Sequence, residues 1–204
     1  MTSDALRLEV KPLTPARWKD LERLFGEKGA RAGCWCMFWR LEKGERFDDV
    51  KGATAKRRFK ALVQKGDAQG LLAYLDGKPV GWLTHGPRRS FPKLDRAPSL
   101  VCDDADEVHS VPCFFIAPEA RGKKVATALL NEAVLTLKKQ GAKVLEGYPV
   151  KPPRPNEKIP AAFAYTGTVP LFEKAGFVPT VRRPTGKQRV RLALSLSRSK
   201  KQKT

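Results

Sequence analysis

The chain has 204 residues, of which 41% are hydrophobic, so it is long enough and apolar enough to form one globular domain. Its 40 Lys and Arg residues against 21 Asp and Glu residues give a formal net charge of +19, which favours an anionic partner such as nucleic acid, a membrane surface or a polyphosphate cofactor. No apolar run approaches the roughly 20 residues that span a bilayer, and residues 1–9 do not resemble a secretory signal. We therefore expect a cytoplasmic monomer or homodimer that binds no membrane.

The chain begins with a strand pattern followed by a helix pattern. Apolar and polar residues alternate over residues 6–12, which is typical of an amphipathic strand. Pro15 suits the first turn of a helix, and the apolar residues that follow it recur at helical spacing.

Residues 33–40 place three aromatic side chains and two thiols between polar segments. Two interpretations are open: an aromatic wall of a pocket for a small ligand, or a hydrophobic plug that covers the sheet. The Cys34-x-Cys36 pair could hold a metal only with further ligands such as His85 or His109, and this spacing fits no zinc pattern. We expect the cysteines of a cytosolic chain to be thiols.

The middle of the chain predicts a helix, a hairpin, a long loop and a strand. Residues 54–65 form a basic helix pattern, and residues 70–75 and 80–86 read as a β-hairpin with a short turn. Residues 87–107 are Pro-rich and charged, and a connection of this length is usually functional or mobile. Residues 108–116 are predicted to be a buried strand.

The stretch after this strand has the chemistry of an anion site. Pro118 stops the strand, residues 121–126 form a basic turn that contains glycine, and helical periodicity starts at Val125. The first N–H groups of a helix have no internal partner, and the helix dipole places positive charge there. We interpret the turn as a cradle for a pyrophosphate; the alternative is solvated basic surface. The common phosphate-binding fingerprints GxxxxGK[ST] and GxGxxG are absent.

The last part of the chain completes an α/β pattern. The helix is expected to end near Gly141, and prolines break up residues 149–160. Strands are predicted at residues 143–148, 177–181 and 189–196, with a short helix at residues 169–175. The order β-α-α-β-β-β-α-β-α-β-β predicts an α/β domain with a twisted mixed sheet.

Two motifs resemble those of the GNAT acyl-CoA N-acetyltransferases. The run from Arg121 to Ala126 is similar to the family's [Q/R]-x-x-G-x-[G/A] motif, in which backbone N–H groups hold the pyrophosphate of coenzyme A, although Lys124 stands where the family has Gly. Residues 171–177 resemble the late L-Y-E-K-x-G-F block. The resemblance implies a GNAT-like fold, a twisted mixed β-sheet flanked by helices, in a domain of residues 1–196. Residues 197–204 form a basic tail that we expect to be disordered.

The resemblance also implies the activity and the cofactor site. We expect an acetyl-CoA-dependent N-acetyltransferase in which the amine of an unidentified small molecule or protein attacks directly. The alternative is a catalytically weak protein that keeps the GNAT scaffold and binds nucleic acid or another anionic partner. The residues expected to bind acetyl-CoA are Phe114, Phe115, Ile116, Arg121, Gly122, Lys123, Lys124, Val125 and Ala126.

The first candidate for a general base is Glu146, because it interrupts an apolar strand near the expected cleft, where burial would raise its pKa. The alternative is a Glu146 that faces solvent or is paired with one of the many arginines. His109, at the start of the strand before the motif, is the second candidate. Asp106 and Glu107 are further options.

The family often protonates the leaving thiolate with the Tyr of the late block. Phe172 stands at this position, so that role would pass to another group. Tyr165 is the nearest phenol in the sequence and is our candidate, with Tyr148 as the other choice.

Overall fold

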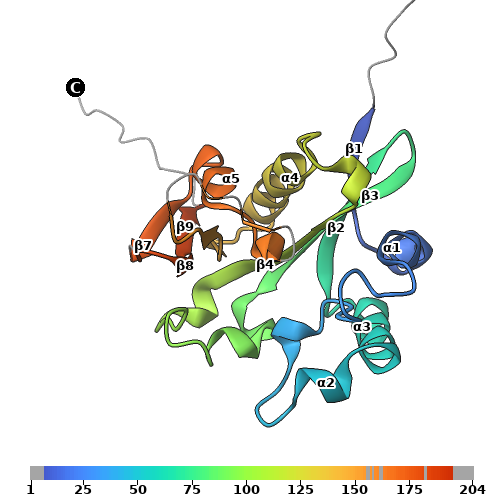
Figure 1. Ribbon diagram of the computed structural model, residues 1–204, viewed down its shortest axis with the longest axis horizontal. Helices are drawn as coiled ribbons and strands as arrows, with labels where there is room; N and C mark the ends of the chain where they lie inside the picture. The colour runs from blue at the N-terminus through green and yellow to red at the C-terminus, as the bar shows by residue number, and fades with distance from the viewer. Residues whose placement is uncertain (1–6, 155–156, 158, 161–162, 182, 195–204) are drawn as a thin grey trace, which may run out of the picture.

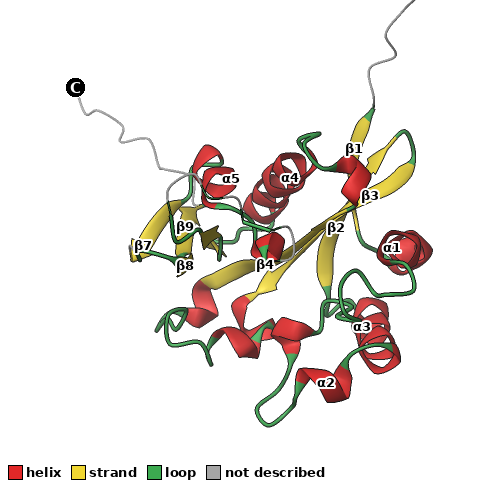
Figure 2. Ribbon diagram, in the orientation of Figure 1, coloured by secondary structure: helices red, strands yellow, loops and turns green. Residues whose placement is uncertain are grey.

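A computed structural model describes residues 7–154, 157, 159–160, 163–181 and 183–194. The predicted tail at residues 197–204 lies outside these described residues. Seven strands form one mixed sheet in the spatial order β1-β2-β3-β4-β5-β9-β7, with helices packed against it (Figures 1 and 2). The predicted fold class is confirmed.

Each predicted helix and strand is present, and the structure adds one single-turn α-helix, a second two-stranded sheet and short 3₁₀ helices. The strands of the main sheet, in spatial order, are β1 (Leu8–Pro12), β2 (Gln69–Leu75), β3 (Lys78–Pro87), β4 (Val108–Ile116), β5 (Val144–Gly147), β9 (Arg189–Ala193) and β7 (Val178–Val181). A separate pair consists of β6 (Val150–Lys151) and β8 (Gly186–Lys187). The helices are α1 (Trp18–Phe25), α2 (Phe47–Val50), α3 (Ala53–Lys65), α4 (Val125–Lys139) and α5 (Val169–Lys174).

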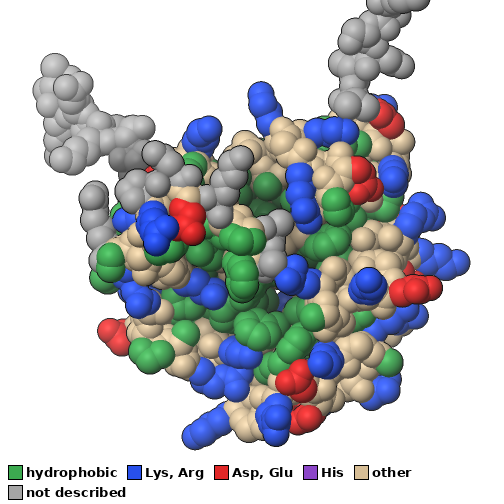
Figure 3. All heavy atoms as spheres, in the orientation of Figure 1, with side chains coloured by type: hydrophobic (Ala, Val, Ile, Leu, Met, Phe, Trp, Pro, Cys, Tyr) green, Lys and Arg blue, Asp and Glu red, His purple; other side chains and the backbone are tan. Residues whose placement is uncertain are grey.

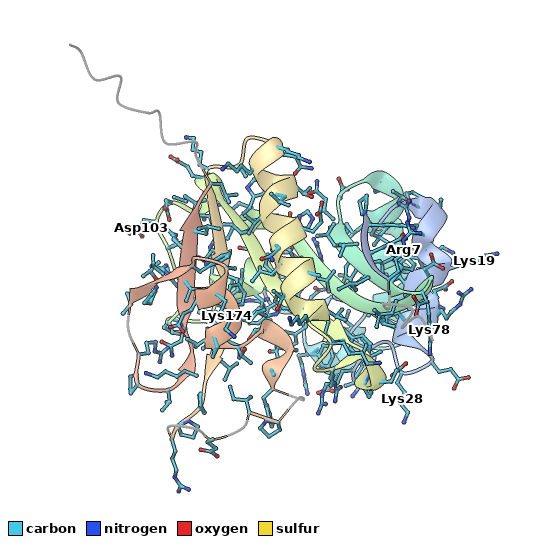
Figure 4. The ribbon with its side chains drawn as sticks, turned by 90° about the horizontal axis from the view of Figure 1, so that it is seen from above. Arg7, Lys19, Lys28, Lys78, Asp103 and Lys174 are labelled. Atoms are coloured by element: carbon cyan, nitrogen blue, oxygen red, sulfur yellow. The ribbon has the colours of Figure 1, made fainter. Side chains whose placement is uncertain are left out.

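The strand alternation builds a core on each face of the sheet. Leu71 and Ala73 of β2 pack in a cluster with α4, while Leu72 and Tyr74 belong to a second cluster with α1 and α3. This is the expected outcome for successive side chains that point to opposite faces. Figure 4 shows α4 lying across the sheet, between the part that carries Asp103 and Lys174 and the part that carries Arg7, Lys19 and Lys78.

The long connection at residues 87–107 is more ordered than a plain loop. It contains the 3₁₀ helices Arg88–Ser90, Pro92–Leu94 and Ala105–Glu107. Its Phe91 and Leu94 are fully buried in a third hydrophobic cluster with Trp39 and Tyr148. No helix in the described part of the chain is both long and apolar enough to cross a membrane.

The sheet opens in the middle because β4 loses its partner β5 at Pro112 and continues beside β3 alone. The parallel pairing of β4 with β5 runs from Val108 to Val111, and the antiparallel register with β3 is irregular at the same place. Proline has no N–H to donate to a ladder, so it is found at edges and bulges. Within the described residues, the end of β4 at Cys113–Ile116 pairs with β3 alone, which leaves its other edge open.

Candidate functional site

A cavity of about 650 Å³ lies along the end of β4 at Cys113–Ile116, beyond the last residue that pairs with β5. It runs from the start of α4 to the segment at residues 34–39. Hydrophobic side chains gather at the hollowed centre of the face in Figure 3, with Lys and Arg side chains around them. Its lining comprises Phe25, Ala30, Arg31, Ala32, Cys34, Cys36, Phe38, Trp39, Phe47, Trp82, Cys113, Phe114, Phe115, Ile116, Pro118, Arg121, Ala126, Ala164, Tyr165, Gly167, Thr168 and Leu171.

The turn before α4 has the backbone geometry of an anion site. Gly122 and Lys124 both have left-handed backbones, with φ of 77° and 61°. The N–H of Ala128 donates to the carbonyl of Lys124 at 3.0 Å, so the N–H groups of residues 125–127 precede the first hydrogen bond of the helix. Lys124, which stands where the family has Gly, adopts a conformation that glycine reaches at less cost.

The predicted cofactor residues divide into three groups. Those that line the cavity are Phe114, Phe115, Ile116, Arg121 and Ala126. Exposed on the turn beside it are Gly122, Lys123 and Lys124. Val125 is buried and packs over Gly81, where an added Cβ would lie 2.6 Å from Val125 Cγ1. Val125 therefore offers a ligand its backbone N–H and not its side chain.

Residues 34–39 take both of the roles that were open from the sequence. Cys34, Cys36, Phe38 and Trp39 line the cavity. Trp35 is instead part of the core, where its ring lies 5.9 Å from that of Trp18.

The thiols of this wall are held in a buried, hydrogen-bonded setting. Trp82 Nε1 donates to Cys36 Sγ at 2.9 Å. Burial raises the pKa of Cys34 to about 11, so this group is a neutral thiol at physiological pH. Among the described residues, no group of three or more His, Cys, Asp or Glu side chains is arranged to hold a metal ion.

Glu146 lies in a buried ionic network and not in the cavity lining. Its carboxylate accepts from Arg88 Nη1 at 2.8 Å, from Arg191 Nε at 2.7 Å and from the Tyr148 hydroxyl at 2.8 Å. The side chains of Glu146 and Arg88 are both fully inaccessible to solvent. Such a carboxylate neutralises buried arginines, which favours the salt-bridge alternative over a base that faces a substrate.

The other candidate acids and bases on this side of the sheet are also outside the cavity lining. His109 pairs with Pro87 across β3 and β4, and burial lowers its pKa. Asp106 and Glu107 form surface ion pairs with Arg89 and Lys143, at 2.8 and 3.0 Å.

Tyr165 differs from these groups because it lines the cavity directly. Its ring lies 6.4 Å from the rings of both Phe38 and Trp39. Burial raises the pKa of Tyr165 to about 12, so its phenol carries a proton throughout the neutral range. Tyr148, the other phenol considered, is fully buried and hydrogen-bonds with Ser110 Oγ at 2.7 Å.

Phe172, at the position of the family's Tyr, is a core residue. Its ring packs 6.0 Å from Phe114 and 5.0 Å from Phe177. A Cβ added at Gly147 would lie 2.1 Å from Phe172 Cε1, so the ring rests directly against the end of β5.

Several lining residues were not among the candidates that the sequence suggested. Phe47 belongs to α2, a helix of a single turn that periodicity does not reveal. Thr168 lies two positions before Pro170 at the start of α5, and this pair is a helix-start pattern in the sequence. Arg31 lies among left-handed residues of an irregular loop, and its sequence context looks like solvated surface.

Solved N-acetyltransferases share this fold. An N-acetyltransferase from Staphylococcus aureus Mu50 superposes with a TM-score of 0.55 at 14% identity, covering 93% of this chain and 99% of that chain. The yncA protein of Salmonella typhimurium, solved with its cofactor acetyl-CoA, has a TM-score of 0.53 at 14% identity, covering 92% of this chain and 94% of that chain.

The sequence identifies the family. The model of the Acetyltransferase (GNAT) family matches residues 34–152, which is more than half of the 204 residues, so the chain belongs to the GNAT acetyltransferase family. An uncharacterised N-acetyltransferase of Methanocaldococcus jannaschii is 24% identical over 118 residues, or 54% of this chain. The match spans 45% of the length of that relative.

Proposed function

We propose that the protein transfers an acetyl group from acetyl-CoA to the amine of an acceptor. The observation that carries this proposal is that one continuous cavity has two chemically different ends. One end has Arg121 and Ala126 beside the open N–H groups of α4, and the other has the aromatic wall of Phe38, Trp39 and Tyr165. The first end suits a pyrophosphate, and the second suits a small apolar or aromatic acceptor.

The reaction uses the open edge of β4. The turn before α4 would hold the pyrophosphate of coenzyme A, and residues 114–116 would hold its pantetheine arm, since their backbone has no strand partner on that side among the described residues. A backbone N–H of this segment polarises the thioester carbonyl. The neutral amine attacks the carbonyl carbon, the carbon–sulfur bond breaks, and the electron pair leaves on the thiolate of coenzyme A.

We assign the protonation of the thiolate to Tyr165 and not to Tyr148. Support comes from the position of Tyr165 in the cavity lining and from its protonated phenol. For the amine proton we propose transfer to water, since Glu146 and His109 lie outside the lining and Glu146 is paired with Arg88 and Arg191. Glu146 then stabilises the sheet by neutralising Arg88 and Arg191, and it takes no part in the proton transfer.

The test is release of free thiol from acetyl-CoA over a panel of amines, combined with calorimetry of coenzyme A binding. Arg121→Ala should weaken binding about tenfold, because it removes one charge-assisted contact at an exposed position. Arg7→Ala is the matched control, on β1's side of the molecule and outside the cavity (Figure 4). Coenzyme A affinity that is unaffected by Arg121→Ala would contradict the cofactor site. The alternative of a nucleic-acid-binding scaffold finds no support in the comparisons.

A further inference from the structure

A second, basic pocket adjoins the aromatic end of the cavity. It has a volume of about 390 Å³ and shares Phe38 and Trp39 with the main cavity. Its other lining residues are Lys93, Arg96, Ala97, Ser99, Leu100 and Lys187. The two shared rings therefore form a partition, with the proposed acetyl-transfer site on one side and three cationic side chains on the other.

The two lysines of this pocket lie on aromatic faces and not beside carboxylates. Lys93 Nζ lies 3.6 Å from the centre of the Phe38 ring. Lys187 Nζ lies 5.9 Å from the Trp39 ring and 5.7 Å from the Tyr165 ring. Within the described part of the chain, neither lysine forms an ion pair.

Arg88 and Arg191, which are fully and partly buried, differ from these lysines because each has carboxylate partners. Arg88 is paired with Glu146 and Asp95, and Arg191 is paired with Glu146 and Asp104. Both lysines are half-buried, and burial lowers the pKa of each, with the Arg96 charge as a second cause at Lys93. A cation that loses solvent without gaining a counter-ion is less stable than one that keeps either. An anion from outside the protein would supply the missing partner.

The Lys, Arg, Asp and Glu side chains that line the two pockets are all of the positive kind. No Asp or Glu is among the described residues that line either of them, whereas Arg31, Arg121, Lys93, Arg96 and Lys187 are. An acceptor with a second positive charge would meet only like charges there. An acceptor with a negative group would be attracted to these cations. With that group in the second pocket, its amine would lie on the main-cavity side of Trp39.

We propose that the second pocket binds an anionic group, a carboxylate or a phosphate, carried by the acceptor amine. The substrate class is then an amine with an acidic substituent, such as an amino acid or an amino phosphate. This inference rests on the proposed function, because the pocket is assigned to the acceptor of the acetyl group. Binding of an anion to the pocket can nevertheless be measured without turnover. Lys93 and Lys187 are positioning residues for the acceptor.

The experiment compares matched ligands. N-Acetyl-γ-aminobutyrate and N-butylacetamide differ in the carboxylate, so their affinities are measured by calorimetry with and without saturating coenzyme A. We expect the anionic ligand to bind about tenfold more tightly, because one charge-assisted contact is worth at least that factor. Lys93→Gln and Lys187→Gln should each reduce this preference, and the double variant should abolish it while leaving N-butylacetamide unaffected. Lys19→Gln, on the exposed face of α1 (Figure 4), is the control and should behave as the unchanged protein.

Turnover gives a second readout. Release of thiol should favour γ-aminobutyrate over butylamine and putrescine, and phosphoethanolamine over ethylamine, through a lower KM and not a higher kcat. Equal affinities for the two calorimetry ligands, or a preference that survives the double variant, would overturn the inference. A double variant that instead weakens coenzyme A would also overturn it, since the pocket would then hold a phosphate of the cofactor. Loss of the proposed function would appear separately, as absent binding of coenzyme A to the unchanged protein.

Discussion

Replacing Glu146 by Gln tests whether this residue supports the sheet or acts as the base. The carboxylate is fully buried and faces Arg88 at 2.8 Å and Arg191 at 2.7 Å. Removing one partner of a buried ion pair typically costs 3–5 kcal/mol, since it leaves an uncompensated charge. Arg88 would keep Asp95 at 2.7 Å and Arg191 would keep Asp104 at 2.7 Å. We therefore expect the lower end of that range, about 3 kcal/mol.

The assay is urea and thermal unfolding followed by fluorescence, with thiol release measured on the folded protein at low temperature. A loss of about 3 kcal/mol corresponds to a fall in Tm of roughly 6–12 °C for a domain of this size. Turnover by the folded protein should change little. The matched control is Asp104→Asn, which removes a carboxylate that is 46% exposed and should cost less than about 1 kcal/mol.

The opposite pattern would refute this reasoning. A general base contributes about 10²–10⁴ to the rate. If Glu146→Gln lowers turnover by that factor and leaves the free energy of unfolding unchanged, Glu146 is the base and the network around it serves to tune it.

Three further predictions concern the cavity and the core. Tyr165→Phe should reduce turnover by about 10²–10⁴ with little loss of stability, whereas Tyr148→Phe should cost about 1–3 kcal/mol of stability and spare turnover; equal, small effects on rate would mean that neither phenol is the acid. Burial, with the charges of His109 and Arg40, lowers the pKa of His85 to about 4. Because the unfolded chain takes up this proton near pH 6.5 and the folded protein does not, stability should fall as the pH drops from about 6.5 to about 4, by up to roughly 3 kcal/mol. Urea titrations should show a smaller fall for His85→Gln, and an equal fall would reject the assignment. Gly147→Ala should destabilise by about 1–3 kcal/mol, since the Phe172 ring must move, and Gly86→Ala offers a comparison at a site where the added Cβ would lie at an ordinary contact distance of 3.8 Å from the Phe91 ring.

The sequence predicted the elements whose signals come from residues close together in the chain. The expected strand at residues 108–116 is β4, and the helix expected from Val125 is α4. Periodicity, a proline and a glycine-containing turn are local features, so they were sufficient to locate the turn before α4 at which we propose that coenzyme A binds.

The ionic network and the second pocket depend on contacts between distant parts of the chain. Glu146 and Arg88 are 58 positions apart, and Glu146 and Arg191 are 45 positions apart. The sequence shows that arginines are abundant but not which of them meets the carboxylate, so the base and the ion pair could not be separated. The same holds for Lys187, which reaches the Trp39 ring only because β8 folds back beside it.

Two residues, Pro112 and Gly147, produce the opening between β4 and β5 in different ways. Pro112 ends the pairing because it has no N–H to offer the next strand, and Val111 with Gly147 is the last matched pair. Gly147, with no Cβ, leaves room for the Phe172 ring to press against the end of β5, and that ring also contacts Phe114 on β4. Phe172 therefore fills the space at the base of the opening and keeps the strands from closing over it. The aromatic residue of the late block thus keeps a structural purpose here without a hydroxyl, since what the opening needs from this position is a ring of this volume.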